Sequence, residues 1–180
     1  MKITETKLKG CFIIEPNVFG DYRGYFSETY NKKVFEDNGI FINFVQDNQS
    51  LSKEKGTLRG IHFQKEPMAQ SKLVMCTQGA VYDVAVDLRE GSETFGEWIG
   101  AELSADNHKQ LLIPKGFGHA FQTITEDAIF QYKVDNFYSK ENEGAIIYND
   151  PDLNIDWPIK DPILSEKDKI APTMKEVDLK

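Results

Sequence analysis

Short strand-like segments at close spacing are the feature that most constrains the fold of this chain. Runs rich in Val, Ile, Phe and Tyr alternate with Asn, Gly, Pro and Asp along most of the sequence. Many short strands with turn residues between them are typical of an all-β sandwich or barrel. The sequence therefore predicts an all-β protein with strands at residues 11–16, 25–30, 44–51, 57–64, 72–77, 80–88, 98–103, 110–113, 119–125 and 129–134.

The remaining segments predict little further regular structure. Residues 31–39 have the signals of one short helix, with Asn31 as the N-cap and Gly39 as the C-terminal stop. Residues 17–24 are rich in turn residues and predict a loop, and the tail beyond residue 149 is irregular. With no repeat and no linker, we expect one domain over residues 1–180. Its core barrel spans about residues 40–135, and the N-terminal strands and C-terminal tail pack on it.

Composition and charge exclude several classes of function. The net charge of −8 argues against a nucleic-acid surface, which needs a basic face. No apolar run approaches the roughly 18 residues of a membrane span, and the N-terminus lacks the apolar core of a signal peptide. Cys11 and Cys76 have neither a metal-ligand nor a CxxC spacing, so both read as buried reduced thiols. We therefore expect a cytoplasmic protein that binds neither nucleic acid nor a membrane.

The segment at residues 57–64 contains one of only three histidines. In a regular strand, alternate residues share a face, so Arg59, Ile61 and Phe63 are predicted on one side and His62 on the other. Gly60 leaves space beside His62, and a strand glycine often marks the close approach of a ligand or another backbone. The prediction is a pocket around His62; the alternative is a half-buried, hydrogen-bonded histidine without a chemical role.

The segment at residues 80–88 alternates most clearly. Tyr82, Val84, Val86 and Leu88 share one face, and the other face includes Asp83 and Asp87. The second face fits either a polar cavity or a solvated surface, and the sequence does not choose between them.

Several common active-site motifs are absent. The chain has no GxGxxG, no GxxxxGK[ST] and no GxSxG sequence. His62 is followed by Phe63 and Gln64, so the paired HxH of a β-barrel metal site is missing as well. We expect no metal and no other cofactor.

What remains is a set of acidic, basic and cationic groups. His62 is a candidate general base because the ordinary pKa of histidine lies near neutral pH. A carboxylate would orient it, and the sequence leaves three candidates open: Asp83, Asp87 and Asp168. Four other side chains have both a chemical and a plain structural interpretation. Tyr132 is either a general acid or a core residue, and Lys72 is either an oxyanion donor or a solvated strand end. Arg23 and Arg59 are either phosphate ligands or surface charges.

Six segments in this order and spacing make the chain closely similar to one known family. They are residues 18–26 with Glu28, then residues 44–50, 58–64, 81–89, 113–121 and 164–168. Together they resemble the dTDP-4-dehydrorhamnose 3,5-epimerase family nearly from end to end. The resemblance implies a cupin-type jelly-roll β-barrel, a homodimer, and catalysis without metal or other cofactor.

The resemblance also implies roles for individual residues. His62 matches the base, Asp168 its carboxylate partner, and Tyr132 the acid on the opposite face of the sugar. Lys72 would lie beside the 4-keto oxygen. The matching substrate-binding positions are Arg23, Arg59, Lys167 and His119 for phosphate and sugar, Glu28, Gln46, Asp47, Asn48 and Glu143 for further contacts, Tyr138 for stacking on thymine, and Phe19 in a loop lent by the neighbouring subunit.

The reaction implied by this family inverts C3 and C5 of dTDP-4-dehydro-6-deoxy-D-glucose to give dTDP-4-dehydro-L-rhamnose. Both protons are α to the 4-keto group, so removing either gives an enolate with its charge on O4. Two alternatives stay open. One is a mono-epimerase or ketoisomerase that acts on a related nucleotide 4-keto sugar, and the other is a sugar-nucleotide-binding barrel without activity.

Overall fold

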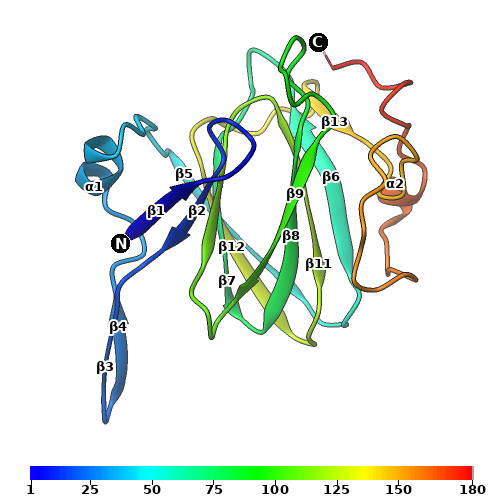
Figure 1. Ribbon diagram of the computed structural model, residues 1–180. Helices are drawn as coiled ribbons and strands as arrows, with labels where there is room; N and C mark the ends of the chain where they lie inside the picture. Colours follow the sequence, from blue (N-terminus) through cyan, green and yellow to red (C-terminus); the bar gives the residue numbers. More distant parts are fainter. Residues whose placement is uncertain (180) are drawn as a thin grey trace.

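A computed structural model describes residues 1–179 as two facing antiparallel sheets (Figure 1). The six-stranded sheet has the order β1 (Lys2–Glu5), β2 (Phe12–Glu15), β10 (Gln110–Ile113), β7 (Lys72–Gln78), β12 (Ala128–Val134) and β5 (Gln46–Ser52). The five-stranded sheet has the order β13 (Glu143–Ala145), β6 (Leu58–Gln64), β11 (Phe117–Thr123), β8 (Ala80–Asp87) and β9 (Trp98–Ser104). The predicted all-β fold, a jelly-roll barrel, is confirmed.

The main core lies between the two sheets and is built from alternate residues of their strands. Val81 and Ala85 of β8 are fully buried there, together with Val74 of β7 and Phe130 of β12. The face of β8 that the sequence left open therefore points into the barrel. It brings two buried carboxylates, Asp83 and Asp87, into the interior.

Outer layers cover both sheets. The C-terminal tail crosses the outside of the five-stranded sheet, where Leu153, Ile155 and Trp157 pack against Ile61 and Val84 (Figure 1). On the other sheet, Phe35 of helix α1 packs with Ile14, Leu73 and Leu112 in a smaller cluster. Each sheet is therefore covered on both faces over much of its area, and residues on both faces of β8 are buried.

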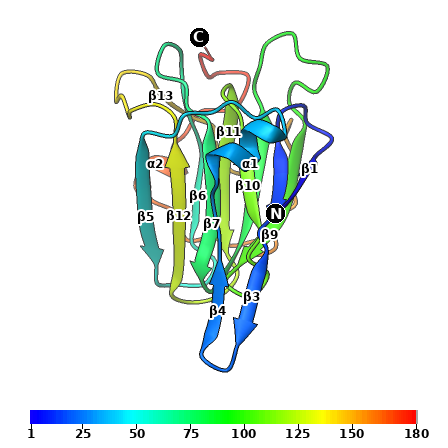
Figure 2. The ribbon, with the colours of Figure 1, turned by 90° about the vertical axis from the view of Figure 1, so that its left-hand side faces the viewer.

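The prediction of a loop at residues 17–24 was wrong. This segment contains β3 (Val18–Asp21), which pairs with β4 (Gly24–Ser27) in a separate hairpin. Gly24 has a φ of +134°, a value open to glycine, and it allows the tight connection that turn residues alone did not reveal. Figure 2 shows the hairpin extending away from the barrel.

Two short helices flank the barrel. The predicted helix is α1 (Lys32–Asp37); its N-cap Asn31 accepts a hydrogen bond from the backbone N–H of Val34. A second helix, α2 (Glu166–Lys169), lies in the tail and was not predicted, because four residues are too few for a periodic pattern. Within residues 1–179, no helix is long and apolar enough to cross a membrane.

Candidate active site

A cavity of about 470 Å³ opens between the two sheets, and both sheets and the tail contribute to its walls. From the five-stranded sheet come side chains of β6 and β11, and from the six-stranded sheet come side chains of β5, β7 and β12. The tail closes one side with residues 163–165, 167 and 168. The polar and aromatic lining residues are Ser50, Thr57, Arg59, His62, Lys72, His119, Phe121, Phe130, Tyr132, Ser165, Lys167 and Asp168.

His62 and Asp168 form the first hydrogen-bonded pair of this cavity. Nε2 of His62 lies 2.6 Å from Oδ1 of Asp168, although the two residues are 106 positions apart. The His62 side chain is 32% exposed, whereas that of Asp168 is only 3% exposed. An ionised carboxylate at Nε2 assigns the imidazole proton to that nitrogen, which leaves the basic lone pair on Nδ1.

Several groups keep Asp168 ionised. Burial raises the pKa of its carboxyl group, but hydrogen bonds from His62 and Ser165 and the charge of Lys167 outweigh that effect. The net pKa is lower than the ordinary value of an aspartate. Asp168 is therefore a carboxylate at neutral pH and can stabilise a positive charge that forms on His62.

The predicted separation of Arg59 and His62 onto opposite faces of β6 was wrong. Both line the cavity, while Ile61 and Phe63 lie in the cluster under the tail. The alternation breaks at Gly60, which has a φ of +125°, and the register with β11 shifts at the same place. A Cβ at Gly60 would lie 2.5 Å from Cβ of Ala120, so the glycine admits the neighbouring strand rather than a ligand.

His119 and Asp83 form a second pair deeper in the barrel. Nε2 of His119 lies 2.9 Å from Oδ2 of Asp83, and both residues are buried. Asp83 is thus not the partner of His62, because its carboxylate pairs with His119 of the neighbouring strand β11. Oδ1 of Asp83 has no hydrogen-bond partner among the described residues.

Asp87 is also not the partner of His62. Its carboxylate accepts hydrogen bonds from Arg89, Ser92 and Thr94, which close the turn after β8. These bonds hold its pKa well below the ordinary value, despite the opposing effect of burial. Asp87 is a structural carboxylate for this turn.

Lys72 and Tyr132 are the proton-bearing side chains from the six-stranded sheet. Burial lowers the pKa of the Lys72 ammonium group to about 8, against the opposing charges of Asp83 and Glu143. Burial raises the pKa of the Tyr132 phenol, with a smaller opposing effect from Arg59. At neutral pH, Lys72 is mostly charged and Tyr132 keeps its proton.

The chain that builds this cavity is similar to known proteins over nearly its whole length. Residues 5–176 match the family model described as dTDP-4-dehydrorhamnose 3,5-epimerase. The chain belongs to this epimerase family.

Relatives support the assignment over nearly the full length of the chain. The dTDP-4-dehydrorhamnose 3,5-epimerase of Shigella flexneri is 52% identical over 169 residues, which are 93% of each chain. The crystal structure of the enzyme from Elizabethkingia anophelis NUHP1 is 56% identical, with a TM-score of 0.93 and coverage of 98% and 97%. The Legionella pneumophila Philadelphia 1 epimerase, solved with dTDP-4-keto-L-rhamnose, is 46% identical, with a TM-score of 0.94 and coverage of 98% and 94%.

Three of the predicted substrate-binding residues, Glu143, Tyr138 and Lys167, lie together at the tail side of the site. Nζ of Lys167 lies 2.5 Å from Oε1 of Glu143, and the Tyr138 hydroxyl donates to Oε2 of Glu143 over 3.1 Å. Of these, Lys167 lines the cavity. Arg59 lines it as well, and its guanidinium donates to Oγ of Ser52 and to the carbonyl oxygen of Leu51.

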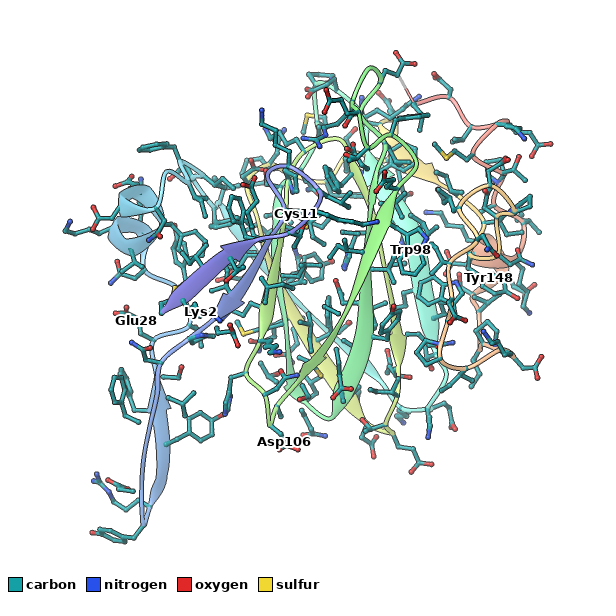
Figure 3. The ribbon with its side chains drawn as sticks, viewed as in Figure 1. Lys2, Cys11, Glu28, Trp98, Asp106 and Tyr148 are labelled. Atoms are coloured by element: carbon teal, nitrogen blue, oxygen red, sulfur yellow. The ribbon has the colours of Figure 1, made fainter. Side chains whose placement is uncertain are left out.

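The other predicted ligand positions lie outside this cavity. Asp47 and Asn48 of β5 line a second hollow of about 340 Å³, where Asp47 pairs with Lys133. The side chain of Gln46 donates to that of Asn48 over 2.8 Å. Phe19, Arg23 and Glu28 belong to the hairpin and its root; Figure 3 shows Glu28 on the opposite side of the molecule from Tyr148 of the tail.

Sequence reasoning missed one residue in direct contact with the base–carboxylate pair. Ser165 is the N-cap of α2, and its hydroxyl donates to Oδ2 of Asp168 over 2.8 Å. The available signal was a serine three positions before an acidic residue, a spacing common at helix N-termini.

Proposed function

We propose that this protein inverts C3 and C5 of dTDP-4-dehydro-6-deoxy-D-glucose to give dTDP-4-dehydro-L-rhamnose, the reaction that supplies dTDP-L-rhamnose synthesis. Membership of the epimerase family supports this substrate. The observation that carries the proposal is the His62–Asp168 pair in a cavity that also contains Lys72 and Tyr132. This set supplies a base, a proton donor and a cation for an enolate.

In the proposed mechanism, Nδ1 of His62 removes a proton α to the 4-keto group. Asp168 stabilises the imidazolium that results, as a carboxylate does beside a catalytic histidine. The electrons of the broken C–H bond move to O4, where the Lys72 ammonium group offsets the negative charge. Because this cation is in place before the reaction, it lowers the barrier without reorganisation.

Inversion requires that the new proton arrive on the other face of the sugar ring. His62 projects from the five-stranded sheet and Tyr132 from the six-stranded sheet, so the base and the proposed acid come from opposite walls. The raised pKa of Tyr132 keeps the phenol protonated and ready to donate. After each inversion His62 releases its proton to solvent and Tyr132 takes one up from solvent, so the same two groups can serve C3 and C5 in turn as the ring shifts or rotates.

The decisive experiment is incubation of the protein with dTDP-4-dehydro-6-deoxy-D-glucose in D2O, followed by NMR of the product. We expect deuterium at both C3 and C5 and inverted configuration at both carbons. Label and inversion at a single carbon would identify a mono-epimerase instead and overturn the double reaction. Full activity after treatment with a chelator is the expected result for a mechanism without metal, and activity that returns only with added metal contradicts it.

We also propose that the protein works as a homodimer in which the hairpin of one subunit completes the site of the other. Phe19, Tyr22, Tyr25 and Phe26 are each more than 60% exposed on this hairpin. A two-stranded hairpin with such an apolar surface is marginal alone and gains stability when a partner covers it. Arg23 would then contribute a charge to the partner's cavity.

A mixing experiment tests the shared site. Arg23→Ala and His62→Ala dimers should each be nearly inactive, whereas unfolding and refolding them together should restore activity. Recovery occurs because one site of each mixed dimer receives both normal residues. A monomer by analytical ultracentrifugation, or no recovery on mixing, would contradict the shared site.

The remaining predicted ligand contacts are proposed for different parts of this substrate. Arg59, His119 and Lys167 are suited to the diphosphate and sugar, and Tyr138 to thymine stacking. Glu28, Gln46, Asp47, Asn48 and Glu143 are proposed as further contacts. We place the protein in the cytoplasm because nucleotide sugars are made there and because Cys11 and Cys76 are unpaired buried thiols.

A further inference from the structure

Ser165 interacts with both ends of the residue that orients the base. Its Oγ accepts a hydrogen bond from the backbone N–H of Asp168 over 3.2 Å. The same hydroxyl donates its only proton to Oδ2 of Asp168 over 2.8 Å. Ser165 thereby fixes the backbone and the carboxylate of Asp168 at once.

The two oxygens of the Asp168 carboxylate have separate partners. Oδ1 faces Nε2 of His62, and Oδ2 faces the Ser165 hydroxyl. The carboxylate is buried, so rotation of its plane away from His62 would leave Oδ2 without its donor. The serine hydroxyl therefore selects the rotation at which Oδ1 meets the imidazole.

We propose that Ser165 is a positioning residue for epimerisation, one that holds the Asp168 carboxylate in the plane that keeps His62 in its basic tautomer. This inference rests on the proposed function. Groups that orient a ligand or a catalytic side chain from behind typically change activity by about 10- to 100-fold when they are removed. A similar loss is expected when the Ser165 hydroxyl is removed.

Three substitutions separate this role from simple helix capping. Glycine is almost as good an N-cap as serine, whereas alanine is poor. If Ser165 acts only as a cap, Ser165→Ala should therefore lower kcat, whereas Ser165→Gly should change it little. Positioning through the hydroxyl proton predicts equal losses in kcat of about 10-fold or more for both. Ser165→Thr keeps the hydroxyl and should restore most of the activity. Near wild-type kcat in Ser165→Gly would overturn the proposal.

A double substitution shows whether Ser165 acts through Asp168. If it does, Ser165→Ala combined with Asp168→Asn should be no slower than Asp168→Asn alone. Losses that multiply would overturn the proposal. The affinity of the Ser165 variants for dTDP should stay within about twofold of wild type, because the hydroxyl holds the base rather than the nucleotide. A weaker affinity for dTDP with unchanged kcat would show that Ser165 positions Lys167 instead, and would overturn the proposal.

The wild-type protein separates failure of this inference from failure of the proposed function. Rates are measured as loss of the C3 and C5 proton signals in D2O, and thermal melts confirm that each variant is folded. A wild-type protein that exchanges neither proton refutes the proposed function itself. An active wild type with an equally active Ser165→Ala variant refutes only the role of Ser165.

Discussion

The molecule contains two histidine–aspartate pairs of similar geometry in different surroundings. His62–Asp168 joins the barrel to the tail at 2.6 Å, and its imidazole is partly exposed to the cavity. His119–Asp83 joins two adjacent strands, β11 and β8, at 2.9 Å, and both residues are almost inaccessible. The first pair reaches across the fold to the substrate space, and the second is built into one sheet.

The surroundings give the two imidazoles different properties. Burial lowers the pKa of His119, against the opposing effect of Asp83, and the nearby charge of Lys72 lowers it further. His119 is therefore neutral at physiological pH and suited to hydrogen bonding rather than to accepting a proton. The His62 side chain is partly exposed in the cavity and has a well-held carboxylate at Nε2, which suits it to act as a base. Hydrogen-bond geometry alone does not distinguish a catalytic pair from a structural one.

The strongest test of the difference between the two pairs is to remove the partly exposed imidazole of His62. His62→Ala should lower the epimerisation rate by roughly 10³- to 10⁴-fold, because it removes general base catalysis. Binding of dTDP should change little. The measurement is proton exchange at C3 and C5 by NMR, with isothermal titration calorimetry for dTDP. A variant at His62 with near wild-type rate would refute the assignment of the base.

Lys72 lines the same cavity as His62 and His119, and its loss should have the next largest effect. Lys72→Gln should lower kcat by about 10²- to 10³-fold, as is typical when one oxyanion donor is lost. In the wild type, the active form of Lys72 is the charged one, with a pKa of about 8. The rate should therefore fall as pH rises through about 8. A pH–rate profile of Lys72→Gln should lack this alkaline fall, and an unchanged profile would remove Lys72 from the mechanism.

The fold was predictable from local patterns, but parts of the site were not. Alternation and turn residues predicted nearly every strand of the barrel, because the order of apolar and polar residues in a strand reflects which of its faces is buried. Alternation failed at Gly60, where a positive φ and a register shift bring Arg59 and His62 to the same side. A single positive-φ residue leaves no periodic trace in the sequence.

Long-range pairing set the other limit. The sequence left Asp83, Asp87 and Asp168 as open candidates for the carboxylate partner of His62. Which of them pairs with His62 depends on contacts that form only in the folded protein. In the fold, Asp83 forms a hydrogen bond with His119, and Asp87 accepts a hydrogen bond from Arg89. Only similarity to a known family favoured Asp168. The first strand of the hairpin, at residues 18–21, was missed for a related reason, because its apolar side chains Val18 and Phe19 are exposed and pack against no core.

A smaller effect should follow from changing the carboxylate of the buried pair. The charge of Asp83 raises the pKa of Lys72, so Asp83→Asn should lower that pKa below about 8. The alkaline fall of the pH–rate profile should then move to lower pH. Glu143→Gln should move it in the same direction but less, since Glu143 is the weaker of the two influences. A melt checks folding, and an unmoved alkaline limb in folded Asp83→Asn would show that the buried pair does not tune Lys72.

The smallest predicted effect is a pH dependence of stability that belongs to His119 alone. Its folded-state pKa is lower than that of an unfolded histidine, because burial disfavours the imidazolium. Stability from this residue is therefore fully present above about pH 6.5 and declines as the pH falls below that value, since the unfolded chain binds the extra proton. The slope from one histidine is at most about 1.4 kcal/mol per pH unit. Thermal melts from pH 7.5 to 5.5 should show a steeper decline in melting temperature for wild type than for His119→Gln, whose amide replaces Nε2 as donor to Asp83. Parallel declines would mean that this imidazole is protonated in the folded protein, and the contrast between the two pairs would be lost.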